Sequence, residues 1–202
     1  GVSTFGADGL RLAPFKPAQS GVSKGEPSDA ARLIEASGAS LAEDEVCPYS
    51  FEAPLAPAVA ARLAGKRISL DHILGAARAL AERVDALLVE GAGGILTPLT
   101  EETSYLDLVR QLGLPALIIA RAGLGTINHT LLTCDTLRRS GIAIAGVILN
   151  RASEGEDASV PHNALEISRR GKVAITADLP FVRDAAERAQ ALDLLLRGKV
   201  HF

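Results

Sequence analysis

A short apolar run that ends in one carboxylate and a glycine cluster constrains the fold of this chain more than any other feature. Residues 85–94 read DALLVEGAGG. An apolar run bounded by turn residues predicts a strand, Ala86–Glu90, buried on both faces of a parallel sheet. Glu90 then lies at the carboxyl end of that strand, where open α/β sheets bind ligands. Because a desolvated carboxylate needs a partner, we expect a cation, a metal ion or several donors beside it, unless Glu90 simply caps the next turn.

Short apolar runs alternate with helical patterns along the chain, which predicts βαβ units and parallel strands. The expected strands are Leu10–Phe15, Ala86–Glu90, Ala116–Ala120, Ala143–Leu149 and Val173–Thr176. The expected helices lie near Asp29–Ala36, Pro54–Ala64, Leu70–Arg83, Ser104–Leu112, Ile127–Ser140, Asn163–Arg170 and Asp184–Leu196. This order predicts an α/β fold: a single domain over residues 1–202 with three αβα layers and a mostly parallel central sheet.

The composition agrees with that class and argues against others. Hydrophobic residues make up 48% of the chain and aromatic residues only 3%, so the core must be mostly aliphatic, as in covered parallel sheets. A net charge of −3 gives no basic surface for nucleic acid. No apolar stretch reaches membrane-spanning length, so we expect no membrane partner and a cytoplasmic location. Cys47 and Cys134 have no metal-type spacing, which predicts free thiols.

Lys16 follows the first expected strand, in the segment FKPAQSG at residues 15–21. Pro17 cannot extend a central strand, so the chain must turn there. A lysine in this place could meet a phosphate or carboxylate as a compact charge, or it could be an ordinary surface lysine. Further on, either Ser28 or Asp29 could cap the next helix, and Asp29 could instead bind a metal ion.

Two more segments begin where strands end. The sequence GLGTINH at residues 123–129 leads glycines into a helix, and free N–H groups at a helix start form an anion site. It is not a G-x-G-x-x-G dinucleotide fingerprint. His129 is interpreted as a polar residue on the helix face. Asn150 could read the edge of a nucleotide base with its amide, or could serve only as a turn residue.

Together these segments resemble the dethiobiotin synthetase family, biotin-pathway enzymes of the P-loop superfamily. The resemblance rests on six features in the family's order: FKPAQSG at 15–21, Asp29, CPYSFEAPLAP at 47–57, VEGAGGILTPL at 89–99, GLGTINHTLLT at 123–133 and GVILN at 146–150. They cover most of the chain. Related amidoligases share the glycine block with its glutamate, whereas the combination with the other blocks is far more specific.

The resemblance implies an ATP-dependent carboxylation and ring closure of 7,8-diaminononanoate, giving dethiobiotin, ADP and phosphate. CO2 adds to one amine to form a carbamate, ATP phosphorylates the carbamate, and the second amine displaces phosphate. The resemblance further implies Mg2+ as cofactor, ATP as co-substrate and a homodimer. Such chemistry gathers anionic groups and stabilises a transferring phosphoryl group by positioning and charge.

By its place in the family's motif, Lys16 resembles the catalytic cation. Asp29 and Glu90 resemble magnesium ligands. This agrees with the preference of Mg2+ for a few carboxylates together with phosphate oxygens and water. The nucleotide-binding residues implied are Asp29, Glu90, Gly91, Gly93, Gly94, Asn150, Leu179, Pro180 and Phe181. The substrate-binding residues implied are Ser20, Thr97, Pro98, Gly125, Thr126, Ile127 and Asn128.

One block of the family pattern is not in this sequence, the P-loop G-x-x-x-x-G-K-[ST] that cradles the triphosphate. The sequence also contains no Met, so we expect the natural protein to carry the missing strand and P-loop. A catalytically inactive nucleotide- or metabolite-binding relative is one alternative, although keeping Lys16, Asp29 and Glu90 argues against it. A cobyrinate-type amidoligase is another, although those chains normally continue into a glutaminase domain. A DNA-partitioning ATPase relative is disfavoured by the charge.

Overall fold

The computed structural model describes residues 4–5, 10–23, 25–155 and 157–184. Contacts within the chain group into two compact units, residues 1–112 and residues 113–202, which are taken here one at a time. Apart from its first residue, the expected helix Asp184–Leu196 lies outside the described residues.

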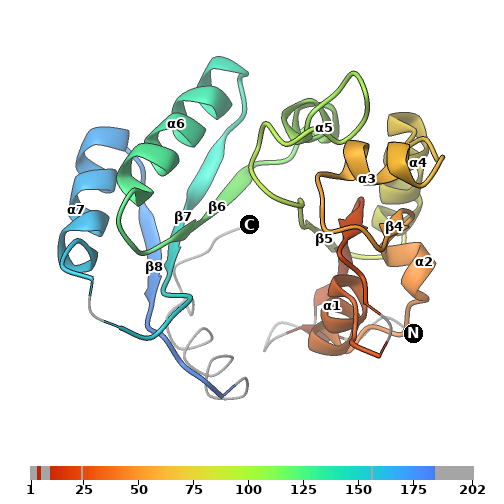
Figure 1. Ribbon diagram of the computed structural model, residues 1–202, viewed down its shortest axis with the longest axis horizontal. Helices are drawn as coiled ribbons and strands as arrows, with labels where there is room; N and C mark the ends of the chain where they lie inside the picture. Colours follow the sequence, from red (N-terminus) through yellow and green to blue (C-terminus); the bar gives the residue numbers. More distant parts are fainter. Residues whose placement is uncertain (1–3, 6–9, 24, 156, 185–202) are drawn as a thin grey trace. The chain divides into compact units, whose positions relative to one another are not determined.

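The sheet of unit 1 has three strands, in the order β1 (Thr4–Phe5), β2 (Leu10–Phe15) and β5 (Ala86–Val89). β1 pairs with β2 in antiparallel fashion, and β2 pairs with β5 in parallel (Figure 1). The last paired residues of the parallel ladder are Phe15 and Val89, and the Glu90 N–H then donates to the Phe15 carbonyl at 2.8 Å. The two residues that follow these strands, Lys16 and Glu90, are therefore held side by side.

The described residues of unit 1 also form five helices and a second sheet of two strands. The helices are α1 (Asp29–Ser37), α2 (Glu43–Val46), α3 (Pro57–Leu63), α4 (Leu70–Ala81) and α5 (Tyr105–Leu112). The small parallel sheet pairs β3 (Gln19–Ser20) with β4 (Ser50–Phe51). Aliphatic and aromatic side chains from β2, α4 and α5, such as Phe15, Ile73 and Leu108, form the core of the unit and are almost completely buried.

The prediction that β5 is buried on both faces is wrong. Leu87 and Val89 pack against the core of unit 1, but Leu88, which points to the opposite face, is 48% exposed. Successive side chains of a strand alternate between faces, and β5 is an edge strand of its sheet with α4 packed on it.

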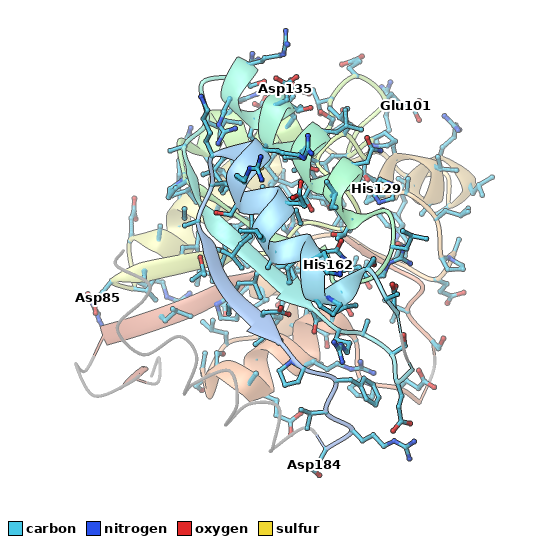
Figure 2. All side chains as sticks on the ribbon, turned by 90° about the vertical axis from the view of Figure 1, so that its left-hand side faces the viewer. Asp85, Glu101, His129, Asp135, His162 and Asp184 are labelled. Carbon is cyan, nitrogen blue, oxygen red and sulfur yellow. The ribbon has the colours of Figure 1, made fainter. Side chains whose placement is uncertain are left out.

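Unit 2 is a parallel sheet with two helices on one face. Its elements are β6 (Ala116–Arg121), α6 (Thr126–Arg139), β7 (Ile144–Asn150), α7 (Val160–Gly171) and β8 (Ile175–Leu179). The strands follow one another in the order β6-β7-β8, and α6 and α7 pack against each other over the sheet (Figures 1 and 2). Val147, Leu149 and Ile167 form the centre of this core.

Several element boundaries differ from those predicted. The last strand begins at Ile175 rather than Val173, because Lys172 adopts a left-handed backbone (φ 45°) that ends α7. Helix α3 begins only at Pro57, since proline suits the first helical turn. The short elements β1, α2, β3 and β4 were not predicted, because two to four residues carry too little periodicity to identify them.

The α/β class with mostly parallel strands is confirmed. Cys47 and Cys134 are free, as predicted, and both are buried. Within the described parts of the chain, no helix combines the length and the apolar character needed to cross a bilayer. The prediction of a single domain stays a prediction.

Candidate active site

Lys16 is buried at the end of β2 and contacts two carboxylates. Its backbone N–H donates to the Val46 carbonyl at 2.8 Å, which fixes the turn after the strand. The side chain is 3% exposed, and Nζ lies 2.6 Å from Oε1 of Glu90 and 3.1 Å from Oδ2 of Asp29. It also donates to the Gly91 carbonyl at 3.1 Å. The alternative of a solvated surface lysine is wrong, and Glu90 has the cationic partner that the sequence led us to expect.

Asp29 reaches Lys16 because another residue caps its helix. Ser28 is the N-cap of α1, and its hydroxyl accepts from the Ala31 N–H at 3.0 Å. Gln19, which is 1% exposed, accepts from the Ala30 N–H at 3.0 Å and so ties β3 to the first turn of the helix. With these N–H groups bonded elsewhere, the Asp29 carboxylate is directed to the lysine.

The charges of this cluster favour a divalent cation. One ammonium and two carboxylates leave one negative charge, and the Asp29 and Glu90 side chains are still 53% and 50% exposed. Both carboxylates contact the same Lys16 nitrogen and so belong to one cluster. Two carboxylates, completed by phosphate oxygens and water, suit Mg2+. In the described ranges, no group of three or more His, Cys, Asp or Glu side chains forms a metal site made of protein ligands alone.

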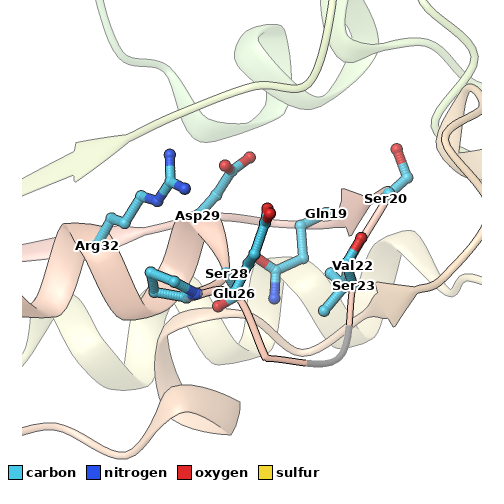
Figure 3. Close-up of a pocket in the computed structure, with 10 residues that line it drawn as sticks. Gln19, Ser20, Val22, Ser23, Glu26, Ser28, Asp29 and Arg32 are labelled. Carbon is cyan, nitrogen blue, oxygen red and sulfur yellow. The ribbon is translucent and has the colours of Figure 1, made fainter.

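A hollow of about 110 Å³ lies beside Asp29 in unit 1, and Ser20 and Arg32 also line it (Figure 3). The side chains of Asp29 and Arg32 rise from the same side of α1. Ser20 was predicted as a site residue from the sequence, whereas Arg32 was not. The i, i+3 spacing of Arg32 from Asp29 was the signal that could have identified it.

The glycines of the block after β5 differ in how closely other atoms approach them. A Cβ on Gly91 would stand 3.4 Å from the Tyr105 ring. Gly93 has a left-handed backbone (φ 79°), and a Cβ there would stand 2.7 Å from the Thr97 hydroxyl, so a larger residue does not fit. The Gly94 carbonyl accepts from the Thr97 N–H at 2.9 Å. The backbone of the block therefore stays open at Gly91, beside Lys16, while Thr97 folds back onto it.

Pro98 is held by the neighbouring elements of unit 1. Its carbonyl accepts from the Ala58 N–H at 3.2 Å, and Pro98 forms an isolated bridge with Ser104. Thr97 and Pro98 follow the glycine block after two intervening residues, Ile95 and Leu96.

The other predicted site residues belong to unit 2. Gly125 is the N-cap of α6 and offers no side-chain cap. The Thr126 hydroxyl is buried against the Thr130 hydroxyl at 3.3 Å, so only its backbone faces the turn. Asn128 and His129 are exposed, which agrees with the interpretation of His129 as a helix-face residue (Figure 2).

Asn150 lies at the carboxyl end of β7, opposite Leu179 of β8. The backbone continues this pairing, since the Arg151 N–H donates to the Leu179 carbonyl at 3.1 Å. Asn150 and the segment Leu179-Pro180-Phe181 are therefore neighbours within unit 2. The structure thus gathers the predicted residues into two groups: the Lys16 cluster with the glycine block in unit 1, and the α6 start with the Asn150 end of the sheet in unit 2.

Residues 3–189 match the model of a family described as AAA domain. A curated relative, the ATP-dependent dethiobiotin synthetase BioD of Anaeromyxobacter sp. (strain Fw109-5), is 52% identical over 201 residues, covering 100% of this chain and 90% of the relative. The protein of that name from Anaeromyxobacter dehalogenans (strain 2CP-C) is 53% identical over 196 residues, 97% and 88% of the two chains. That from Bacillus thuringiensis (strain Al Hakam) is 38% identical over 186 residues, 92% and 77% of the two chains.

Among solved structures, a ParA family ATPase from Chlorobium tepidum TLS is similar with a TM-score of 0.50. The similarity covers 94% of this chain and 78% of the other at 13% sequence identity. At this identity the likeness concerns the fold alone, and it agrees with the P-loop NTPase-like class expected from the sequence.

Proposed function

The chain belongs to the ATP-dependent dethiobiotin synthetase family, and we propose that it catalyses the ATP-dependent carboxylation and ring closure of 7,8-diaminononanoate to dethiobiotin. The relatives' names favour this reaction over an inactive relative or a cobyrinate-type amidoligase. The observation that carries the proposal is the meeting of Lys16, Asp29 and Glu90 in one cluster, since they come from three separate segments.

In this proposal Lys16 supplies a fixed positive charge where the carbamate and the transferred phosphoryl group meet. Its nitrogen is held from three sides, by Asp29, Glu90 and the Gly91 carbonyl, so it needs little reorganisation when negative charge develops nearby. Ser20, on the wall of the hollow beside Asp29, would donate a hydrogen bond to the same anionic group. Phosphoryl transfer depends mainly on such positioning and charge.

Asp29 and Glu90 would hold Mg2+, the charge that neutralises ATP phosphates in this kind of chemistry. The exposed halves of both carboxylates and the net negative charge of the cluster support this assignment. Gly91, Gly93 and Gly94 would let the phosphates approach the backbone.

The residues of unit 2 would bind the remaining parts of the ligands. Asn150 would read adenine, with Leu179, Pro180 and Phe181 as a wall beside it, a role supported by their adjacency across β7 and β8. The α6 start, Gly125–Asn128, would take the carboxylate of the substrate's tail. Thr97 and Pro98 are also proposed to bind the substrate. We also propose a homodimer and a cytoplasmic location, on the strength of the family resemblance.

The test is dethiobiotin formation from 7,8-diaminononanoate, bicarbonate, ATP and magnesium, followed by mass spectrometry of the product and by ADP release. The matched blank omits the diamine, so that uncoupled ATP hydrolysis is measured separately. Product that depends on all four components supports the proposal. Nucleotide binding without any diamine-dependent ADP or dethiobiotin would instead favour the inactive, ligand-binding relative.

A further inference from the structure

The turn that begins α6, residues 122–126, is held by side chains from a later segment of unit 2. Oδ2 of Asp157 accepts a hydrogen bond from the Leu124 N–H at 2.8 Å. Oδ1 of the same carboxylate accepts from the N–H and the hydroxyl of Ser159, at 2.9 and 2.7 Å. These hydrogen bonds lower the pKa of Asp157, so the carboxylate stays ionised. Oδ1 of Asp157 is therefore held by Ser159, and Oδ2 holds the turn by its hydrogen bond to Leu124.

Asn163 holds the same turn from inside the unit. Its side chain is 2% exposed, and Nδ2 donates to the Ala122 carbonyl at 2.7 Å and to the Ser159 hydroxyl at 3.1 Å. Ser159 thus links Asn163 to Asp157. Asn163 is buried, Ser159 and Asp157 are half-buried, and hydrogen bonds connect all three. We call these three connected side chains, Asp157, Ser159 and Asn163, the clamp. The clamp hydrogen-bonds to the turn at the Ala122 carbonyl and the Leu124 N–H.

The packing at Gly123 shows how closely the clamp approaches. A Cβ on Gly123 would stand 2.9 Å from Oδ2 of Asp157, closer than a carbon and an oxygen tolerate. Gly125, which ends the turn, has no side chain with which to cap α6. The turn therefore depends on the clamp for its conformation, and the first N–H groups of α6 depend on the turn for their direction.

We propose that the clamp is a positioning device for the anionic tail of the substrate, acting through the turn and the first N–H groups of α6. This inference rests on the proposed function, which gives the α6 start to the tail carboxylate. Asp157 does not need to touch the substrate. The negative charge of Asp157 repels a nearby anion and so weakens substrate binding, whereas its positioning of the turn strengthens binding. Because the two effects have opposite sign, mutation can separate them.

The first experiment compares Asp157→Ala and Asp157→Asn in steady-state kinetics of the natural protein. Asp157→Ala removes the acceptor for Leu124, and we expect KM for 7,8-diaminononanoate to rise about tenfold, or about 1.4 kcal/mol. We expect kcat and KM for ATP to change by less than about twofold, because the Lys16 cluster is untouched. Asp157→Asn keeps one acceptor oxygen and should recover part of the loss.

Glu154→Ala is the matched control, because it removes the same charge from the same loop. Glu154 pairs with Arg183 on the surface, and its side chain is 66% exposed. We expect its kinetics to equal those of the unmutated protein. A lower KM for the diamine in Asp157→Ala would mean that repulsion by the Asp157 charge outweighs its positioning effect. An unchanged KM would mean that the clamp does not affect substrate binding. Either result overturns the inference.

Hydrogen–deuterium exchange without ligands gives a second readout that does not depend on turnover. In Asp157→Ala the amide of Leu124 and those of the first turn of α6 should exchange faster, while Glu154→Ala leaves them protected. Unchanged protection in Asp157→Ala would refute the clamp. Asn128→Ala distinguishes failure of the clamp inference from failure of the proposed tail site at the start of α6. If Asn128→Ala raises KM for the diamine and Asp157→Ala does not, the inference alone fails. If neither raises KM although Leu124 has lost protection, the proposed tail site fails.

Discussion

Replacing Lys16 with methionine tests the central cluster most directly. Methionine keeps an unbranched side chain in the buried channel but removes the ammonium that lies 2.6 Å from Glu90 and 3.1 Å from Asp29. Two unit charges about 4 Å apart interact by about 4 kcal/mol at an effective dielectric constant of about 20. If Lys16 stabilises the transferring phosphoryl group in the transition state by that amount, turnover of Lys16→Met should fall about a thousandfold.

The stability of the variant should change much less than its activity. Asp29 and Glu90 are 53% and 50% exposed, so water can solvate them once the lysine is gone. We expect the free energy of unfolding to fall by about 1–2 kcal/mol, below the cost of stranding a fully buried charge. Thermal unfolding followed by circular dichroism checks this value.

The assay is the initial rate of dethiobiotin formation at saturating ATP and diamine. Lys66→Met, the same exchange at an exposed position, is the control and should keep full activity. A loss of less than tenfold, or about 1.4 kcal/mol, in Lys16→Met would show that Lys16 only neutralises its two carboxylates.

Three further outcomes are expected. Glu90→Gln should lower turnover by about a hundredfold or more and raise the magnesium concentration needed for half-maximal rate, because a carboxylate ligand is lost; unchanged magnesium dependence would contradict that role. Asn150→Ala should reduce the preference for ATP over GTP, measured as the ratio of kcat/KM values, by about tenfold, and a constant ratio would mean that adenine is read elsewhere. Burial raises the pKa of the Cys47 thiol to about 11, so iodoacetamide at pH 8 should label the unfolded but not the folded protein. Since the neutral thiol is favoured in the fold, this contribution to stability is complete below the ordinary thiol pKa and is lost as the pH rises towards 11.

The strand-end residues of unit 1 were predictable because their positions follow from local pattern and one topological rule. Apolar runs located β2 and β5, and parallel strands have their carboxyl ends at one edge of a sheet, so Lys16 and Glu90 were expected at the same edge. The sequence could not decide between Ser28 and Asp29 as the helix cap. The hydrogen bond from Ala31 to Ser28 settles it and leaves Asp29 for Lys16.

Burial and the longest-range contacts were beyond the sequence. The run Ala86–Glu90 reads as apolar throughout, yet whether Leu88 is covered depends on what packs on each face of the sheet. The clamp on the α6 turn joins Leu124 and Asp157 across 33 positions, from a loop whose composition carries no motif.

The sequence by itself therefore determined which residues carry charge, roughly where the longer strands and helices run, and which glycines precede a helix, because these depend on neighbours within a few positions. Tertiary structure alone decided that Lys16 is buried and paired with both Asp29 and Glu90, and that Asp157 grips the start of α6. The physical reason is that the strength of a charge or hydrogen bond is set by distance and exposure to water, and both are fixed only when separate segments pack together.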